Sequence, residues 1–230
     1  MEKKATPELQ QRSLTLRQKR NMAYFVKATE NILKHDGIQG ASIRRIAAEA
    51  GYNSATLYNY FPDLEYLILY GSVGYLRDYI LLLKDSLDNH MTSLERYKTV
   101  YTCFNHFAFQ DPEIFYNMFF GRYSGRMTEV VRTYYQDLFP EQLEGLPEDV
   151  QQMVIRGTLV DRDRIIMSHM VQDGFVAPEK EEMTLELIIA LHESYIHKAC
   201  LAGPKLDKEA LQQRFMTLFD YILAHSGPDQ

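Results

Sequence analysis

The chain has 230 residues, of which 46% are hydrophobic and 24% charged, so it can bury a full core in one large domain or two smaller ones. Only two cysteines occur, which argues against a disulfide scaffold and fits a reducing compartment. The polar start has no apolar signal core, and no run approaches the roughly 18 apolar residues of a membrane span. We therefore expect a cytoplasmic protein without a membrane partner.

The charges are divided unevenly along the chain. Residues 1–62 carry 10 Lys and Arg against 5 Asp and Glu, whereas residues 63–230 carry 15 against 26, so the net charges are +5 and −11. Local charge at a contact surface governs binding to phosphate groups, so a basic N-terminal part on an acidic body is consistent with DNA recognition. A basic terminus that is merely solvated is the alternative interpretation.

The first predicted helix covers residues 18–36 and ends before Gly37, which is a stop signal. Its apolar side chains share one stripe that consists of Met22, Phe25, Val26, Ile32 and Leu33. Residues 1–17 are polar and carry four basic side chains. We expect these residues to form a flexible arm, and a basic arm that adds phosphate or minor-groove contacts is the alternative.

Two short helices that meet at a glycine turn are predicted within residues 38–64. The first has apolar residues at helical spacing up to Ala50, with Ser42 as its N-cap and Gly51 as its left-handed end. The second begins at once, with Asn53 as its N-cap. The pattern is typical of a helix-turn-helix, although two helices around a tight turn also occur as ordinary packing.

The second of these helices has an inward and an outward face. Leu57 and Phe61 are four residues apart and pack inward. The outward set is small or hydroxyl-bearing and consists of Ser54, Ala55, Thr56, Tyr58 and Asn59. A helix whose backbone lies close to base edges in a DNA major groove needs such side chains.

The rest of the chain is predicted to be helical, with no strand pair and no repeat. A long apolar helix is expected from Glu65 to Asn89, Thr92 and Glu95 form a capping-box pattern for the next, and Asp111-Pro112 begins another. Further helices are expected at residues 126–138, 148–173, 179–201 and 207–225, with breaks at Phe139-Pro140, Gly145–Pro147, Gly174 and Gly203-Pro204.

The predicted helix-turn-helix resembles the DNA-binding domain of the TetR family of transcriptional regulators. Matched positions in fixed register between residues 20 and 70 carry the resemblance, among them Ile46-Ala47, Ala50-Gly51 and Thr56–Pro62. The later residues match only as a helical pattern of suitable length. Leu64 departs from the family, which usually has a phosphate-binding lysine here, so we expect weaker backbone anchoring or compensation elsewhere.

The resemblance implies an all-α fold and a function. A three-helix DNA-binding domain at residues 18–64 would precede a helical ligand-binding and dimerisation domain at residues 65–230. The protein would be a dimeric repressor that a small effector releases from an inverted-repeat DNA operator. By matched position, contacts to base edges or the groove fall to Arg44, Ser54, Thr56 and Tyr58, and contacts to the DNA phosphates to Ser42, Arg45, Asn53 and Tyr60.

The last two predicted helices, residues 179–201 and 207–225, are apolar on more than one face. In the second, the stripe Leu211, Phe215, Leu218 and Ile222 is flanked by Phe219 and Leu223. One stripe suffices for a helix's own core, so the wider surface predicts a homodimer through a four-helix interface, which the resembled family also uses. A helix pair buried wholly within one chain is the alternative.

The middle of the body is rich in aromatic residues, with ten Phe and Tyr between residues 97 and 123. Aromatic walls and methionines suit a cavity for a bulky apolar or aromatic effector, and Asn105, His106 or tyrosine hydroxyls could orient it. A plain aromatic core is the alternative. The leading pocket candidates share one helix face, and the others follow: Tyr97, Tyr101 and Phe104, then Phe115, Tyr116, Phe119 and Met167.

The sequence gives little support for catalysis, so we expect no enzyme, no metal and no cofactor. His192 and His197 are five residues apart and do not share a helix face, as a zinc-protease pair must. The acids near His169 alternate with arginines at residues 161–164, which predicts a solvated charge cluster rather than metal ligands. The rival functions are a DNA-binding helical scaffold without an effector and a small-molecule enzyme with unrecognised chemistry.

Overall fold

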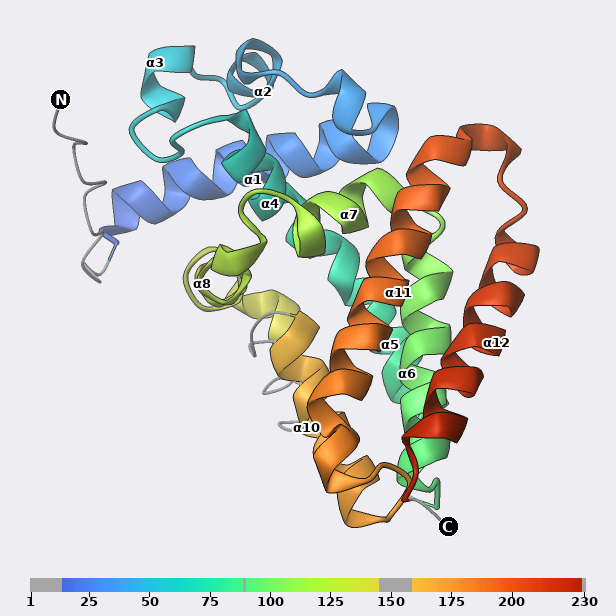
Figure 1. Cartoon of the computed structure of the whole chain (residues 1–230). Helices are drawn as coiled ribbons and strands as arrows, with labels where there is room; N and C mark the ends of the chain where they lie inside the picture. Colours follow the sequence, from blue (N-terminus) through green and yellow to red (C-terminus); the bar gives the residue numbers. More distant parts are fainter. Residues whose placement is uncertain (1–13, 89, 145–158, 229–230) are drawn as a thin grey trace, which may run out of the picture.

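A computed structural model describes residues 14–88, 90–144 and 159–228 (Figure 1). Every regular element in these ranges is helical, which confirms the predicted all-α fold. None of the helices described is long and apolar enough to cross a membrane. Most of the predicted N-terminal arm, Asn89 and the start of the predicted helix at 148–173 lie outside the described residues.

Three helices form the N-terminal head: α1 (Leu16–Asp36), α2 (Ile43–Glu49) and α3 (Ser54–Leu57). The first begins two residues before its predicted start, because Thr15 and Gln18 form a capping box that the sequence reading overlooked. Its predicted apolar stripe is buried. Gly37 ends α1 with φ of 65°, a left-handed conformation that glycine adopts without steric cost.

The body is built from eight further α-helices within the described ranges. They are α4 (Leu64–Ser72), α5 (Leu76–Ser86), α6 (Ser93–Ala108), α7 (Pro112–Phe120), α8 (Met127–Thr133), α10 (Leu159–Gln172), α11 (Glu181–Ala202) and α12 (Lys208–Ser226). Short 3-10 turns cover Ile38–Gly40, Val73–Tyr75, Ser124–Arg126, Pro140–Leu143, Pro178–Lys180 and Gly203–Lys205, and a π-helical turn covers Tyr134–Leu138. The last two helices run side by side along one edge of the body (Figure 1).

Two helices that the sequence predicts as continuous are interrupted in the structure. The single helix expected from Glu65 to Asn89 is interrupted by the 3-10 turn between α4 and α5, where Gly71 and Gly74 weaken the α-helix. The helix expected at residues 126–138 ends in the π-helical turn. The capping box of Thr92 and Glu95 is confirmed, whereas Asp111 makes no side-chain cap and only the proline that follows it marks the start of α7.

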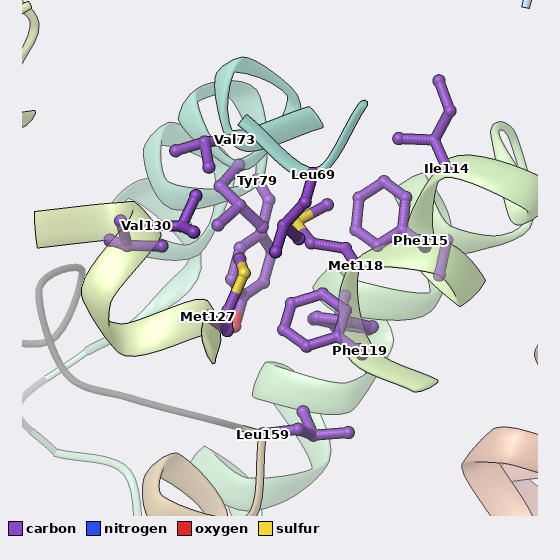
Figure 2. Close-up of a cluster of buried hydrophobic side chains, with 14 of the residues drawn as sticks. Leu69, Val73, Tyr79, Ile114, Phe115, Met118, Phe119, Met127, Val130 and Leu159 are labelled. Atoms are coloured by element: carbon purple, nitrogen blue, oxygen red, sulfur yellow. The ribbon is translucent and has the colours of Figure 1, made fainter. Parts of the chain in front are cut away.

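The core is continuous from head to body, because α4 packs against α1 on one side and against α7 and α8 on others. Figure 2 shows the body part of this core, where Leu69 from α4 meets Phe115 and Met118 from α7. In the head, the ring of Phe61 lies edge-on to the rings of Phe25 and Tyr70, with centroids 6.4 and 5.4 Å apart. The N-terminal head is therefore anchored on the same buried helix that enters the body.

The contact between α4 and α1 depends on a glycine. A Cβ atom at Gly71 would lie 2.6 Å from Cγ2 of Thr29, and that side chain is buried with its hydroxyl donating to the Phe25 carbonyl at 2.8 Å. Gly71→Ala should overpack this contact by about 1 to 3 kcal/mol and regain about 1 kcal/mol of helix propensity. We expect urea unfolding to show a net loss of stability of up to about 2 kcal/mol.

Gly125→Ala is the matched control, because a Cβ there meets no atom within 4 Å. Its free energy of unfolding should change by less than about 0.5 kcal/mol. Equal effects of the two substitutions would show that the close approach of α1 and α4 does not constrain the fold.

Candidate DNA-reading surface and effector cavity

Side-chain caps set the start of both helices of the helix-turn-helix. The Ser42 hydroxyl accepts a hydrogen bond from the Arg45 backbone N–H at 3.2 Å, and Oδ1 of Asn53 accepts from the Thr56 N–H at 2.8 Å. Between the two helices Gly51 has φ of 78°, a left-handed turn that most side chains would oppose. The two predicted caps and the glycine turn are thus confirmed.

The second helix presents the predicted faces. Leu57 and Phe61 are fully buried, while Ala55, Tyr58 and Asn59 are exposed. The two hydroxyl residues of this face, Ser54 and Thr56, are half-buried. The α-helical part is short, since α3 covers only Ser54–Leu57 and hydrogen-bonded turns continue from it to Phe61. The outward face remains continuous across this change, so small and hydroxyl side chains can approach a groove.

Asn21 of α1 joins the two sides of the glycine turn. Its side-chain oxygen accepts from the Tyr52 hydroxyl at 2.9 Å, and its side-chain N–H donates to the Tyr60 hydroxyl at 2.8 Å. The Tyr60 hydroxyl accepts in this hydrogen bond, so its own hydrogen is left to donate to a group outside the head. Sequence reasoning missed this buried asparagine, because its two partners are 31 and 39 residues away in the sequence and only the fold brings them together.

The residues predicted to contact DNA all lie in the head, but their side chains are held differently. Arg44 and Tyr58 project from the surface. Arg45 instead forms an ion pair with Asp36 and donates to the Gly40 carbonyl at 3.1 Å. The other predicted contacts are exposed or half-buried: Ser42, Asn53, Ser54, Thr56 and Tyr60.

The departure at Leu64 has a structural counterpart. Its side chain is half-buried against the core at the first position of α4, so it contributes packing where a lysine would extend into solvent. The neighbouring Asp63 caps α4 by accepting from the Tyr66 N–H at 2.9 Å. The start of α4 is therefore stabilised by a cap and by apolar contact.

A cavity of about 400 Å³ lies in the body between α5, α6, α10 and α11. Its walls are largely apolar, with a few polar side chains among them. The lining residues are Tyr79, Leu87, Arg96, Val100, Tyr101, Phe104, Leu159, Arg162, Asp163, Ile165, Ile166, His169 and His192.

Two of the predicted pocket residues, Tyr101 and Phe104, line this cavity. Tyr97, on the same helix, packs on the Phe219 ring of α12 at a centroid distance of 5.2 Å. The remaining candidates lie outside the lining, in the packed core or against its edge: Phe115, Tyr116, Phe119 and Met167. The two proposed orienting residues, Asn105 and His106, lie along a different groove between α6 and α12.

The solvated charge cluster predicted at residues 161–164 is wrong for Asp163, which is buried and lines the cavity. The Tyr101 hydroxyl donates a hydrogen bond to its Oδ2. Burial raises the pKa of Asp163 to about 7, although this hydrogen bond opposes the rise. Helical spacing alone could not show that α10 turns an aspartate inward.

His192 is a second polar group in the cavity wall that sequence reasoning did not assign. Its ring is fully buried beside those of Phe104 and Tyr101, with centroids 4.8 and 5.2 Å away. Neither ring nitrogen has a hydrogen-bond partner among the described residues. Burial lowers its pKa to about 3, so the imidazole is neutral, with one donor and one acceptor. His197 is exposed, so the two histidines do not share a face of α11, as their five-residue spacing predicts.

Residues 25–70 match the family model described as bacterial regulatory proteins, tetR family. The helix-turn-helix domain belongs to the TetR family. No curated protein matches the chain in sequence.

Several solved structures share the overall fold of this chain. RolR in complex with resorcinol is 16% identical with a TM-score of 0.58, and the match covers 93% of this chain and 98% of RolR. Thermus thermophilus FadR, a TetR family transcriptional repressor in complex with lauroyl-CoA, is 14% identical with a TM-score of 0.56, over 86% and 92% of the two chains. Bacillus halodurans FadR is 13% identical with a TM-score of 0.52, over 88% and 94%. At these identities the likeness establishes the fold alone.

The TetR-type head is joined to the body by polar contacts around the buried α4. Asp63 Oδ2 accepts from the Tyr123 hydroxyl at 2.6 Å and from Arg122 at 3.4 Å. Lys19 of α1 forms an ion pair of 2.6 Å with Asp137 in the π-helical turn. These contacts tie the head to the segment that follows α7.

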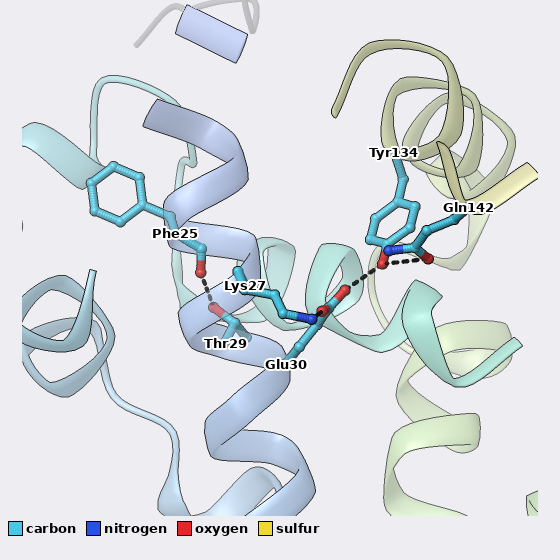
Figure 3. Close-up of polar contacts among 6 residues, drawn as sticks. All are labelled: Phe25, Lys27, Thr29, Glu30, Tyr134 and Gln142. Atoms are coloured by element: carbon cyan, nitrogen blue, oxygen red, sulfur yellow. Dashed lines mark hydrogen bonds and ion pairs between the residues drawn. The ribbon is translucent and has the colours of Figure 1, made fainter. Parts of the chain in front are cut away.

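Glu30 makes a further contact of this kind. As Figure 3 shows, its carboxylate accepts from the Tyr134 hydroxyl and pairs with Lys27 at 2.9 Å, and the same hydroxyl lies 3.3 Å from Gln142 Oε1. Burial and the charge of Glu30 raise the pKa of Tyr134, so its hydroxyl stays protonated and donates. Because the head and the body share this hydrogen bond, their relative orientation is constrained.

The carboxyl group of Asp163 should make the free energy of unfolding depend on pH. Because burial raises the folded pKa of Asp163 to about 7, the unfolded chain holds fewer protons than the folded protein between about pH 4 and 7. The contribution of this group to stability is greatest at low pH and falls by about 1.4 kcal/mol per pH unit as the pH rises toward 7. We expect the stability difference between wild type and Asp163→Asn, from urea unfolding, to show this slope.

The comparison with Asp163→Asn is needed because His192 acts in the opposite sense. Its lowered pKa reduces stability as the pH falls below the ordinary histidine value of about 6.5. The exposed Asp173 provides a control, since Asp173→Asn should leave the pH profile unchanged. Parallel profiles of wild type and Asp163→Asn would rule out a buried carboxyl.

Proposed function

We propose that this protein is a dimeric, sequence-specific transcriptional repressor that a small effector in the body cavity releases from DNA. The observation that carries the proposal is the pairing of a TetR-type helix-turn-helix with an apolar cavity in the same chain. The head is basic and the body acidic, so phosphate attraction is confined to the reading surface.

On the DNA side, the exposed faces of α2 and α3 would enter the major groove. Arg44 can donate two hydrogen bonds to the acceptors of a guanine, which makes it the leading base-reading residue. Two heads related by a two-fold axis would read an inverted repeat whose half-sites lie about 34 to 36 Å apart, or a multiple of that distance.

On the effector side, a volume of about 400 Å³ lies within the usual range for ligand sites of roughly 300 to 1,000 Å³. The apolar walls suit a bulky apolar or aromatic molecule. Two proteins of similar fold are complexes with small molecules, one with resorcinol and one with lauroyl-CoA. Effector binding in the body is therefore a reasonable extension to this chain.

The proposed release mechanism is a change in the orientation of the head. Tyr79 of α5 lines the cavity, and α5 continues, through the 3-10 turn, from the α4 that anchors the head. An effector that favours one packing of α5 would move α4 and change the spacing of the two heads. Linkage then requires that operator DNA weaken effector binding by the same factor.

Dimerisation is proposed through α11 and α12. Large apolar side chains remain exposed on this helix pair, with exposed fractions of 57% for Met183, 48% for Leu187, 75% for Leu201 and 63% for Tyr221. The inner face of α12 packs within the chain through Phe215, Phe219 and Leu223, which are buried. The second apolar face thus supports a dimer in which this helix pair packs against the same pair of a second, two-fold related chain.

The DNA-reading proposal is tested by fluorescence anisotropy with DNA from upstream of the protein's own gene. At roughly 150 mM salt, nonspecific binding through counterion release is suppressed, and scrambled DNA serves as the competitor. Arg44→Ala should cost about 1 to 3 kcal/mol of binding free energy and flatten the preference at one base pair.

Lys34→Ala is a control that also removes one exposed positive charge from the head, at the C-terminal end of α1. It should leave the base preference unchanged. Unaltered affinity and selectivity in Arg44→Ala would remove this residue from the reading surface, and absence of any selective binding to the upstream DNA would count against the repressor.

The dimer is tested by multi-angle light scattering at micromolar concentration. Leu187→Glu places a charge in the proposed interface and should convert a dimeric mass to a monomeric one, since buried unpaired charge is costly. Leu16→Glu, at a leucine that is 66% exposed in the head, should leave the dimer intact. A monomeric wild type would refute the interface.

A further inference from the structure

The buried end of the effector cavity is built from Asp163, Tyr101 and His192, which come from α10, α6 and α11. All three side chains are buried, whereas Ile165 and His169, which also line the cavity from α10, are exposed. Buried polar groups in the wall of a largely apolar cavity fix the orientation of whatever enters it. The chemistry of these three groups therefore selects the effector.

The Asp163 carboxyl is the acidic group at this end, and its bonded neighbour is a neutral phenol rather than a cation. Tyr101 donates to Oδ2, and no ion pair involves Asp163 among the described residues. The adjacent Arg162 lies near Tyr79 and Tyr135, whose pKa values its charge lowers. An ionised carboxylate in such surroundings is costly unless a ligand supplies positive charge.

His192 adds a second unsatisfied group. Both of its ring nitrogens lack partners among the described residues, and as a neutral imidazole it offers one acceptor and one donor. A buried polar side chain without a partner destabilises the folded protein, and a bound ligand that satisfies it recovers that loss. The rings of Tyr101 and Phe104, whose centroids lie 5.2 and 4.8 Å from that of the imidazole, line the same cavity.

We propose that the cavity binds an effector with an apolar aromatic body and one protonated amine, whose ammonium group donates to the Asp163 carboxylate and to the acceptor nitrogen of His192. This inference rests on the proposed effector role of the cavity. An ammonium neutralises the carboxylate, whereas a neutral hydroxyl leaves its charge uncompensated and an anion repels it. The apolar body would lie against Val100, Ile166 and Leu159.

The test uses three probes that share one ring system: 1-naphthylmethylamine, 1-naphthylmethanol and 1-naphthoic acid. Isothermal titration calorimetry on the full-length protein at pH 7.5 should show that the amine binds about 10-fold or more tightly than the alcohol, the range expected for hydrogen bonds to a charged group. The acid should bind most weakly. Equal or tighter binding of the alcohol or the acid would overturn the proposal, and so would no detectable binding of the amine at millimolar concentration.

Asp163→Asn keeps the shape of the side chain and removes its charge. It should abolish the preference for the amine over the alcohol while alcohol binding remains, which also shows that the variant is folded. Asp173→Asn, at an exposed position of the same segment, should behave as wild type. An amine preference that survives in Asp163→Asn would refute the role assigned to this carboxyl.

The DNA-binding measurement separates this inference from the proposed function. Selective operator binding without an amine preference would leave the repressor intact and reject the ligand class. An amine preference without selective DNA binding would support the ligand class and reject the repressor.

Discussion

The close packing of α4 against α1 is the contact on which the rest of the molecule depends. From Tyr66 to Ser72 every residue of α4 is buried, so this short helix belongs at once to the core of the head and to that of the body. Gly71 permits the approach because Thr29 occupies the space that a side chain would need. Since close-packed interfaces do not deform continuously, a displacement of α4 must move the head as a unit.

Polar contacts around this joint connect it with the cavity wall. Tyr134 donates to Glu30 of the head, and its ring lies 4.9 Å from that of Tyr135. The charge of Arg162, which lines the cavity, lowers the otherwise raised pKa of Tyr135. A side chain of the cavity wall thus acts electrostatically on the neighbour of Tyr134, and the proposed coupling between effector and DNA would use this route.

The cavity is costly to the folded chain, and that cost fits a binding site. Burying Asp163 beside a phenol and His192 beside aromatic rings leaves polar groups that an apolar core of the same shape would avoid. Functional sites commonly retain such destabilising groups because a ligand satisfies them. The acidic side chain and the neutral imidazole therefore constrain the chemistry of the proposed effector more than the aromatic walls do.

Local signals in the sequence determined the helix-turn-helix, because caps and glycine turns act over a few residues: Ser42, Asn53 and Gly51 predicted its ends, and Leu57 and Phe61 its inward face. The all-α class and most helix positions followed from helical spacing in the same way. Tertiary structure alone decided the rest. Whether Asp163 faces solvent or a cavity, and whether Tyr97 or Phe115 lines that cavity or packs behind it, depends on how helices distant in sequence are rotated against one another. Helical periodicity shows that a face is apolar, but it cannot show what lies opposite.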